Sequence, residues 1–342
     1  MTGELMTLTA RFAERDRRNG RFLIEEMLAM CEQLGVATSI ALRGIGGFGP
    51  THVARSDRAL TLSEDPPAVL IALDSEDVMR GLADEVAMMI RRGVVTLQRD
   101  RPRPDLPADA VVRVSLYLGR RHRVAGNPGH VAVCAALHRL GFTAAEVLLG
   151  VDGTIGGRRR RAHFIGRNAD VPLRISAVGT VPQLDAARAE LLAQLPAAPI
   201  TVDPVVVCRS AGNALAPIPE PNESGYLKLI VRTAEDTLYD GRPIHRGLIT
   251  RLMAAGHVGG ATSVRGIWGY LNGEAPHGDR FLSLTRHVPV VTSIVDTAES
   301  IARSFPIVEE LTGSGGLVTC EPVDAAVSRD DGRSRGRLGP AG

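Results

Sequence analysis

Leu42-Arg43-Gly44-Ile45 recurs twice along the chain in related form, as Leu148-Leu149-Gly150-Val151 and as Val264-Arg265-Gly266-Ile267. The three segments are about 110 residues apart, and a proline that opens an apolar run follows the glycine of each one after 23, 22 and 23 residues. These prolines are Pro67, Pro172 and Pro289. A period of about 110 residues is too long for a solenoid repeat and is typical of a self-contained domain. The spacing therefore predicts three tandem copies of one small domain.

Each copy carries the same succession of predicted strands and helices. In the first copy, apolar and polar residues alternate over 6–12, with Thr7, Thr9 and Arg11 on the polar face. This period of two is typical of an antiparallel sheet that turns one face toward solvent. An amphipathic helix is predicted over 23–34, followed by two strands, a second helix and a short last strand. The order strand-helix-strand-strand-helix-strand predicts an α+β fold of three ferredoxin-like (βαββαβ) domains.

The boundaries of the copies follow from composition. Stretches at Arg101–Ala110 and Ser210–Ser224 are rich in proline and lack periodicity, which is typical of linkers. We therefore place the domains at 1–103, 110–209 and 224–325. The charged, glycine-rich residues 326–342 are expected to form a disordered tail. Three equal copies can close a ring as three subunits do in a trimer, so we expect a monomeric pseudo-trimer.

The composition is that of an ordinary globular protein, with 44% apolar and 23% charged residues. A net charge of +2 gives no general attraction to nucleic acid or to an anionic membrane. No apolar run approaches the roughly 20 residues of a membrane-spanning helix, so no membrane insertion is expected. The N-terminus lacks the pattern of a secretory signal, and the four cysteines lack metal-binding spacing. We therefore expect reduced thiols in a cytoplasmic protein.

The connection between the second and third strands of each copy is unusually long. It spans roughly 20 residues where a hairpin would suffice, and such loops are usually functional or disordered. Its glycines would let the backbone approach a ligand, and nearby arginines would supply charge-assisted hydrogen bonds to an anion. The alternative is a hydrated loop with tight turns. The predicted ligand-binding residues are Arg43, Gly44, Gly46, Gly47, Phe48, Gly49, Arg265, Gly266, Trp268 and Gly269.

Other chemistry has weaker support in the sequence. The glycines from Gly44 to Gly49 match the dinucleotide-binding fingerprint, but Pro50 and a polar loop follow where a helix is needed. Arg158–Arg161 could contact phosphates, although a hydrated loop tip is the simpler interpretation. A metal would depend on the loop residues His52, His163 or His277, which lack ligand spacing. Nucleophilic and paired-acid patterns do not recur, so we expect no enzymatic activity, no obligatory cofactor and no nucleic-acid partner.

Two of the copies resemble a known family. Leu42–Gly49, the run Leu62-Ser63-Glu64-Asp65-Pro66-Pro67 and a strand ending at Asp74 together resemble the family catalogued as domain of unknown function 190, which is PII-like. The third copy is similar to it through Val264–Tyr270, Pro289 and Val295-Asp296-Thr297. The middle copy matches mainly by position. It has Leu149 in place of Arg43 and Arg265, and Gly179 in place of Asp74 and Asp296.

The resemblance implies a ferredoxin-like domain that trimerises with its sheets facing inward, here with three subunits fused. PII-type proteins bind adenine nucleotides in the clefts between subunits. They dock the long loop, called the T-loop, onto membrane transporters or enzymes. Relatives in this family are often encoded beside fluoride exporters. An adenine nucleotide effector and a transporter or enzyme partner are therefore what the resemblance leads us to expect.

Three hypotheses about function follow. The first is a non-enzymatic signal-transduction protein with nucleotide in the clefts between repeats, where the departures in the middle copy leave its own site structural or specific for another ligand. The second is a protein-interaction scaffold that needs no effector. The third is a divalent-metal-binding mimic of a trimer with the same fold.

Overall fold

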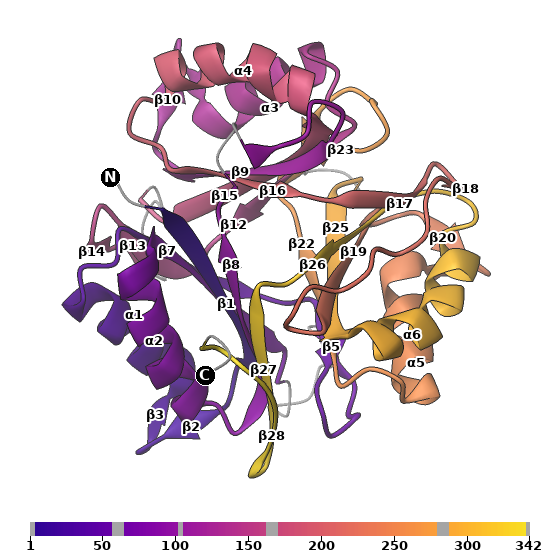
Figure 1. The fold of residues 1–342 in the computed structure, drawn as a ribbon. Coiled ribbons are helices and arrows are strands. Elements are labelled where there is room, and N and C mark those ends of the chain that lie inside the picture. The colour runs from indigo at the N-terminus through magenta and orange to yellow at the C-terminus, as the bar shows by residue number, and fades with distance from the viewer. Residues whose placement is uncertain (1–3, 57–64, 102–104, 162–169, 279–286, 340–342) are drawn as a thin grey trace.

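The structure is a computed structural model that describes residues 4–56, 65–101, 105–161, 170–278 and 287–339. Within these ranges six helices lie on the outside of the molecule, and antiparallel sheets face the middle (Figure 1). The same element order occurs three times around a common centre. This arrangement confirms the predicted α+β class and the three copies.

The first repeat consists of β1 (Leu5–Ala13), α1 (Leu23–Gln33), β4 (Thr38–Arg43), β7 (Pro67–Ser75), α2 (Glu76–Met89) and β8 (Arg92–Arg99). The second consists of β9 (Val111–Gly119), α3 (Gly129–Arg139), β12 (Ala144–Leu149), β15 (Pro172–Thr180), α4 (Val181–Gln194) and β16 (Ile200–Pro204). The third consists of β19 (Tyr226–Ala234), α5 (Ile244–Ala255), β22 (Ala261–Arg265), β25 (Pro289–Thr297), α6 (Ala298–Leu311) and β26 (Leu317–Pro322). In each sheet the strands lie in the order fourth, first, third, second, as in β8-β1-β7-β4.

A two-residue ribbon precedes the first helix of each repeat. The ribbons are β2 (Arg17–Arg18) with β3 (Arg21–Phe22), β10 (Arg123–Val124) with β11 (Asn127–Pro128), and β20 (Leu238–Tyr239) with β21 (Arg242–Pro243). Gly20, Gly126 and Gly241 sit in these turns with φ of 81°, 83° and 71°, where a side chain would be strained. The glycines thus belong to the ribbon turns that lead into the helices.

Each repeat buries its two helices against one face of its own sheet. In repeat 1, Leu8, Met27 and Val86 come from β1, α1 and α2 and are fully buried in one cluster. Corresponding clusters form in the other two repeats. The amphipathic periodicity therefore predicted the right helix faces, because apolar side chains at that period are removed from water together.

The long connections exchange strands between repeats. β5 (Gly46–Phe48) of repeat 1 pairs with β22 of repeat 3, and β6 (Arg55–Ser56) extends it. β13 (Asp152–Ile155) of repeat 2 pairs with β4 of repeat 1 and carries β14 (Arg158–Arg159). β23 (Trp268–Tyr270) of repeat 3 pairs with β12 of repeat 2 and carries β24 (His277–Gly278). The exchange is cyclic, so each repeat completes the sheet of one neighbour.

One glycine in each exchanged strand is required by close backbone contact. A Cβ atom at Gly47 would lie 2.5 Å from the carbonyl oxygen of Ala261. At Gly153 it would lie 2.0 Å from the oxygen of Ser39, and at Gly269 2.2 Å from that of Ala145. A real Cβ does not approach that closely, so these three glycines let one repeat lie against the next.

The fourth strands are also extended across repeats. After repeat 2, β17 (Val206–Ser210) pairs with β26 and continues into β18 (Asn213–Ala214). After repeat 3, β27 (Ala325–Asp330) pairs with β8 and turns into β28 (Arg333–Arg337). The prediction of a disordered tail over 326–342 was therefore wrong for the residues that form this hairpin. The charged, glycine-rich composition supplies a tight turn and polar side chains for an exposed edge.

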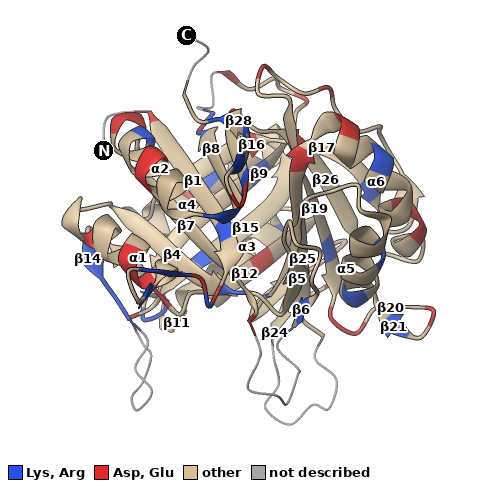
Figure 2. Cartoon of the chain, turned by 90° about the horizontal axis from the view of Figure 1, so that it is seen from below, with Lys and Arg blue, Asp and Glu red and all other residues tan. Residues whose placement is uncertain are grey.

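The polar face of the first strands does not face solvent, contrary to our expectation. Arg113 is 3% exposed, while Ser115 and Arg232 are fully buried. The three sheets turn these faces toward one another, so neighbouring repeats cover what an isolated copy would expose. Charged residues consequently lie on the central strands as well as on the outer helices (Figure 2). One inter-repeat ion pair there joins Arg232 Nε to Glu146 Oε2 at 3.0 Å.

Candidate functional site

A cleft of about 340 Å³ lies between repeats 1 and 3. Repeat 1 contributes the end of β1, the segment from Phe48 to His52 and the start of β8. Repeat 3 contributes the loop 256–260 after α5 and the end of β25, and the β27–β28 hairpin adds further lining residues. Small-molecule sites typically enclose about 300–1,000 Å³, so the cleft is large enough for a ligand.

Glycines form one wall of the cleft. Gly256 ends α5 with φ of 66°, and the backbone N–H of Gly259 donates a 2.7 Å hydrogen bond to Oδ2 of Asp296. Oδ1 of Asp296 accepts a 2.7 Å hydrogen bond from the N–H of Thr297. A Cβ on Gly260 would lie 2.9 Å from the carbonyl oxygen of Phe48. The loop is therefore fixed by Asp296 and pressed against the exchanged strand β5.

Arginines and aspartates both line the cleft. Its lining includes Arg11, Arg55, Arg92, Arg329 and Arg335, against the acidic residues Asp16, Asp296 and Asp330. Arg55 pairs with Asp65, and Arg92 pairs with Asp331. Arg11 Nη1 and Arg329 Nε are buried and have no hydrogen-bond acceptor among the described residues. Such donors suit an anionic ligand, because charge-assisted hydrogen bonds to arginine are among the stronger polar contacts.

Burial and neighbouring charge act on the titratable groups of the cleft. Burial, reinforced by Arg174 and Arg113, lowers the pKa of Arg11 to about 10. Burial also raises the pKa of Asp16, although a hydrogen bond from Ala13 and the charges of Arg55 and Arg92 oppose the shift. Burial is the main cause of both shifts, because it disfavours the charged form of each group.

An aromatic pair borders the cleft. The rings of Phe48 and His52 lie 5.5 Å apart between centroids with a 33° tilt. His52 Nδ1 lies 3.3 Å from the carbonyl oxygen of Met253 on α5, which ties the loop of repeat 1 to repeat 3. Phe48 is only 4% exposed, so the aromatic surface that the pair presents to the cleft comes mainly from His52.

The residues predicted for ligand binding in repeat 1 divide into two groups. Phe48 and Gly49 line the cleft, and Gly46 and Gly47 belong to the strand that carries them. Gly44 instead lies under Pro67, since a Cβ there would come within 2.5 Å of Pro67 Cγ. Arg43 Nε pairs with Glu14, and the lining of the cleft does not include Arg43.

The residues predicted in repeat 3 lie elsewhere. Arg265 forms two hydrogen bonds of 2.7 and 2.8 Å to Glu235, which repeats the Arg43–Glu14 pair. The junction with repeat 2 contains Gly266, Trp268 and Gly269. The Trp268 ring meets the His130 ring edge-on there, with 6.4 Å between the ring centroids. The structure therefore does not bring the repeat 3 residues together with Phe48 and Gly49.

The junction between repeats 1 and 2 is closed at the corresponding position. Thr154 stands where Phe48 stands in the cleft, and its Oγ1 donates to the carbonyl oxygen of Val36 at 2.9 Å. Arg159 binds Asp152 at 2.7 Å and Glu25 of repeat 1 at 2.9 Å. Arg161 also pairs with Glu25. Two of the four consecutive arginines thus hold repeats together.

The junction between repeats 2 and 3 is closed by aromatic side chains. Tyr270 is fully buried, and its ring meets the His138 ring edge-on with 5.1 Å between the ring centroids. A Cβ on Gly179 would lie 2.5 Å from the ring of Phe142. The ring therefore occupies the space that an aspartate would need, which explains why repeat 2 has glycine where the others have Asp74 and Asp296.

Several lining residues were missed from the sequence. Gly259 and Gly260 were available as a signal, because the equivalent loops at 35–37 and 141–143 have no such pair. Arg329 and Arg335 gave no signal, since they reach the cleft only through the pairing of β8 with β27, and Arg92 begins β8 in repeat 1.

The described residues contain no cluster of three or more His, Cys, Asp or Glu side chains able to hold a metal ion. His277 packs against His287 with centroids 4.6 Å apart, and His52 is placed as described above. His163 lies outside the described residues. No helix in the described part of the chain is long and apolar enough to cross a membrane.

The fold and the cleft define a protein of three α+β repeats that share strands around a common centre. The chain belongs to the DUF190 family, described as Uncharacterized ACR, COG1993, which matches residues 5–101, 111–207 and 226–325. A UPF0166 protein of Aquifex aeolicus (strain VF5) is 34% identical over 97 residues, which is 28% of this chain and 89% of that relative.

Two solved structures are similar over part of the chain. An unknown protein from Galdieria sulphuraria aligns with 59% of this chain and 99% of its own at 12% identity, with a TM-score of 0.19. A putative glycine cleavage system transcriptional repressor aligns with 60% of this chain and 98% of its own at 12% identity, with a TM-score of 0.16. Neither similarity carries an argument about fold or function at these TM-scores.

Proposed function

We propose that the chain is a non-enzymatic, PII-like regulatory protein that binds an adenine nucleotide in the cleft between repeats 1 and 3. Its repeats are ferredoxin-like units that stand in for the subunits of a trimer. The strand order β8-β1-β7-β4 supports the ferredoxin-like assignment, and the cyclic exchange of β5, β13 and β23 supports the trimer-like one. Membership in the DUF190 family agrees with both.

The charge and shape of the cleft carry the proposal. Of the five lining arginines, Arg55 and Arg92 pair with carboxylates outside the lining, and the unpaired buried nitrogens of Arg11 and Arg329 favour an anion. The His52 ring lines the cleft next to the buried Phe48 and is the aromatic surface on which a base would stack. A nucleotide combines a polyanion with a flat ring, and the volume of about 340 Å³ is in the range of small-molecule sites.

Regulation of a partner protein would depend on the long connection of repeat 1, which would bind that partner. His52 and Arg55 line the cleft, and the chain continues from them into residues 57–64, which lie outside the described ranges. A ligand that contacts His52 and Arg55 would favour some conformations of this connection over others. It would thereby change the affinity of the connection for a partner protein. The partner implied by the resemblance is a transporter, a fluoride exporter among them, or an enzyme.

Isothermal titration with ATP, ADP, AMP and cyclic AMP tests the proposal, with pyrophosphate as a control for phosphate binding alone. We expect one nucleotide per chain. Arg329→Gln should weaken it about 10- to 100-fold, because a hydrogen bond to a charged group contributes about 1.5–3 kcal/mol. Arg43→Gln is the matched control and should leave the affinity unchanged. Loss of binding in the Arg43 variant alone would place the site outside this cleft.

The closed junctions favour a second candidate, an interaction scaffold that needs no effector. Thr154 and Tyr270 fill positions equivalent to Phe48, so two of the three junctions serve to hold repeats together. If no nucleotide in the panel produces heat or a thermal shift, the scaffold becomes the better description.

A further inference from the structure

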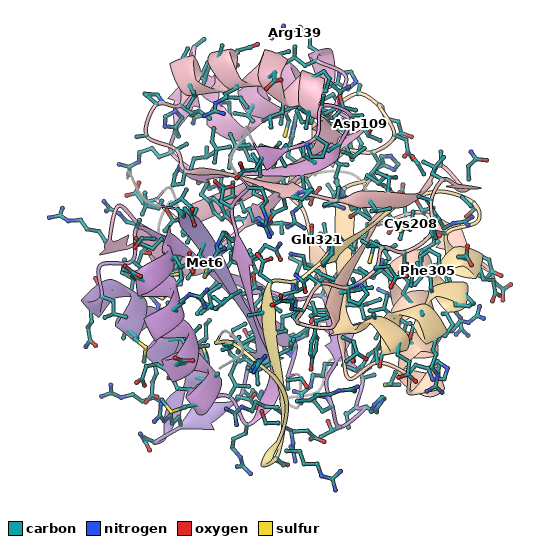
Figure 3. All side chains as sticks on the ribbon, viewed as in Figure 1. Met6, Asp109, Arg139, Cys208, Phe305 and Glu321 are labelled. Atoms are coloured by element: carbon teal, nitrogen blue, oxygen red, sulfur yellow. The ribbon has the colours of Figure 1, made fainter. Side chains whose placement is uncertain are left out.

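A second, smaller cavity of about 60 Å³ lies where the inward faces of the three sheets meet. Equivalent positions of the three first strands contribute Thr7, Arg113 and Lys228. The strands beside them place Gln98 opposite Thr7, Asp203 opposite Arg113 and Glu321 opposite Lys228. Figure 3 shows Glu321 near the middle of the molecule. The same position of the three repeats thus holds a neutral pair in repeat 1 and oppositely charged pairs in repeats 2 and 3.

Cations outnumber carboxylates around this cavity. Arg11, Arg113, Arg174 and Lys228 line it together with Asp203. Arg113 donates to Asp203 at 2.8 Å and to Glu321 at 2.7 Å, and Lys228 pairs with Glu321 as well. Asp203 and Glu321 therefore neutralise two of the four positive charges. Another acid near Asp203, Asp100, does not line the cavity and accepts a hydrogen bond from the N–H of Val202.

Arg11 and Arg174, the other two cations, donate hydrogen bonds to neutral hydroxyl groups. Arg11 Nε donates to Ser293 Oγ at 3.2 Å, and Arg174 Nη2 donates to Ser115 Oγ at 2.9 Å. Among the buried arginine nitrogens that find no acceptor in the described part of the chain, three belong to residues that line this cavity: Arg11 Nη1, Arg113 Nε and Arg174 Nε. Arg113 as a whole is only 3% exposed. Buried charged donors are rarely left unpaired, so these nitrogens favour an acceptor that carries negative charge.

Burial is the first cause of the lowered pKa values in this cluster and repulsion between its cations is the second, whereas Glu321 and Asp203 raise the pKa of Arg113. Burial and then Arg113 lower the pKa of Lys228 to about 8, against the opposing effects of Glu321 and Asp203. The pKa of Arg11 is lowered for the same reasons. Water could accept hydrogen bonds from the unpaired nitrogens and could donate to the unpaired oxygens Gln98 Oε1 and Glu321 Oε2. Water would not balance the charge, however.

We infer that the central cavity binds one small monovalent inorganic anion of about the size of chloride, held by Arg11, Arg113 and Arg174. A volume of about 60 Å³ has room for such an ion with water and is far below the 300 Å³ or more that nucleotide-sized ligands need. This inference concerns a different cavity from the proposed nucleotide site, although the two cavities share Arg11. Arg11 and Ser293 border both cavities, so the anion would also stabilise one wall of the cleft.

Bromide locates the site directly. Crystals of the wild-type chain grown or soaked in sodium bromide should show one anomalous peak among Arg11, Arg113 and Arg174. A solution measurement complements it: the melting temperature is followed while chloride replaces gluconate at constant ionic strength. Gluconate is too large for the cavity, so a saturable rise with chloride is expected.

Two variants make the solution result specific. Arg174→Gln should weaken the apparent chloride affinity about tenfold or more, because it removes a charged donor. Arg139→Gln is the control, since Arg139 pairs with Glu190 on the exposed surface, and it should keep the wild-type response. Absence of central bromide density, or a melting temperature independent of chloride, would overturn the inference. An equal chloride response in wild type and Arg174→Gln would also overturn it.

Discussion

The N–H of Gly259 donates to Oδ2 of Asp296 at 2.7 Å, and the same bond, with the same length, joins Ala37 to Asp74 in repeat 1. Each aspartate also accepts a 2.7 Å hydrogen bond from the residue that follows it, Thr297 or Ser75. The aspartate thus ties the loop after the first helix to the end of the third strand. Of the two aspartates, Asp296 lines the cleft between repeats 1 and 3. Substitutions of Asp74 and Asp296 can therefore be compared to distinguish an effect on stability from an effect on nucleotide binding.

Asp296→Ala is predicted to reduce both stability and nucleotide affinity. The substitution removes the acceptor of two backbone donors and should lower the free energy of unfolding by about 1–3 kcal/mol. Asp74→Ala removes an equivalent pair and should cost a similar amount without weakening binding. Chemical denaturation and calorimetric titration of both variants provide the comparison. Equal loss of affinity in the two variants would show that the cleft responds to global stability alone.

Gly47→Ala is predicted to be strongly destabilising, by about 2–4 kcal/mol, because its Cβ would lie 2.5 Å from the carbonyl oxygen of Ala261. Gly46→Ala in the same strand is the control. The nearest atom to a Cβ at Gly46 is 3.8 Å away, so this change should be close to neutral. Thermal unfolding of the two variants measures the difference. A stable Gly47→Ala protein would contradict the pairing of β5 with β22.

Deletion of residues 326–342 is predicted to lower the melting temperature and to weaken nucleotide binding. The deletion uncovers β8, removes the 3.0 Å hydrogen bond from Tyr226 Oη to the carbonyl oxygen of Arg335, and removes Arg329 from the cleft. Arg333→Gln, on an exposed strand position, is a control that should leave both properties unchanged. A truncated chain with wild-type stability would mean that the hairpin is not part of the folded protein.

Asp100 is predicted to make stability fall as pH rises from about 4 to about 6. Burial, more than the nearby charge of Asp203, raises the pKa of Asp100 to about 6 from its ordinary value of 3.8. The folded state therefore holds this proton more tightly than the unfolded state, and the stabilisation is lost as pH rises through the folded pKa.

The matching variant is Asp100→Asn, which keeps an acceptor for the N–H of Val202 without the charge. Relative to wild type it should gain stability across the same pH interval, by about 2–3 kcal/mol at most. Urea denaturation at several pH values measures the gain. A difference between the two proteins that does not change with pH would show that Asp100 is not protonated preferentially in the fold.

The elements of each repeat could be predicted from the sequence because their signals are local. Leu8 and Met27 lie on faces set by periods of two and 3.6, and both are fully buried as those periods indicate. The glycines of the long connections could be located but not interpreted. Gly47 is fixed by a contact with Ala261, more than 200 residues away, which no pattern around Gly47 encodes.

The candidate site was only partly predictable for the same reason. Phe48 and Gly49 line the cleft, whereas Arg43, chosen because it is a cation in a recurring segment, pairs with Glu14 of its own repeat. Arg329 reaches the cleft through a hairpin whose composition predicted disorder. Arg113 lies on a strand in which polar and apolar residues alternate, and the polar face of this strand packs against the sheets of the other two repeats. Its burial therefore depends on residues of those repeats and could not be predicted from the strand alone.

The cyclic exchange of strands has a consequence for the order in which the chain is made. β4 is completed as soon as β13 leaves the ribosome, and β12 is completed by β23. β5 has to wait for β22, the longest separation of the three. Domains generally fold from the N-terminus during synthesis. β22 and β23 lie close together in repeat 3, so both junctions of that repeat form after the junction between repeats 1 and 2. The cleft is therefore absent until repeat 3 and the β27–β28 hairpin have been made, and a ligand bound there reports that translation has passed repeat 3.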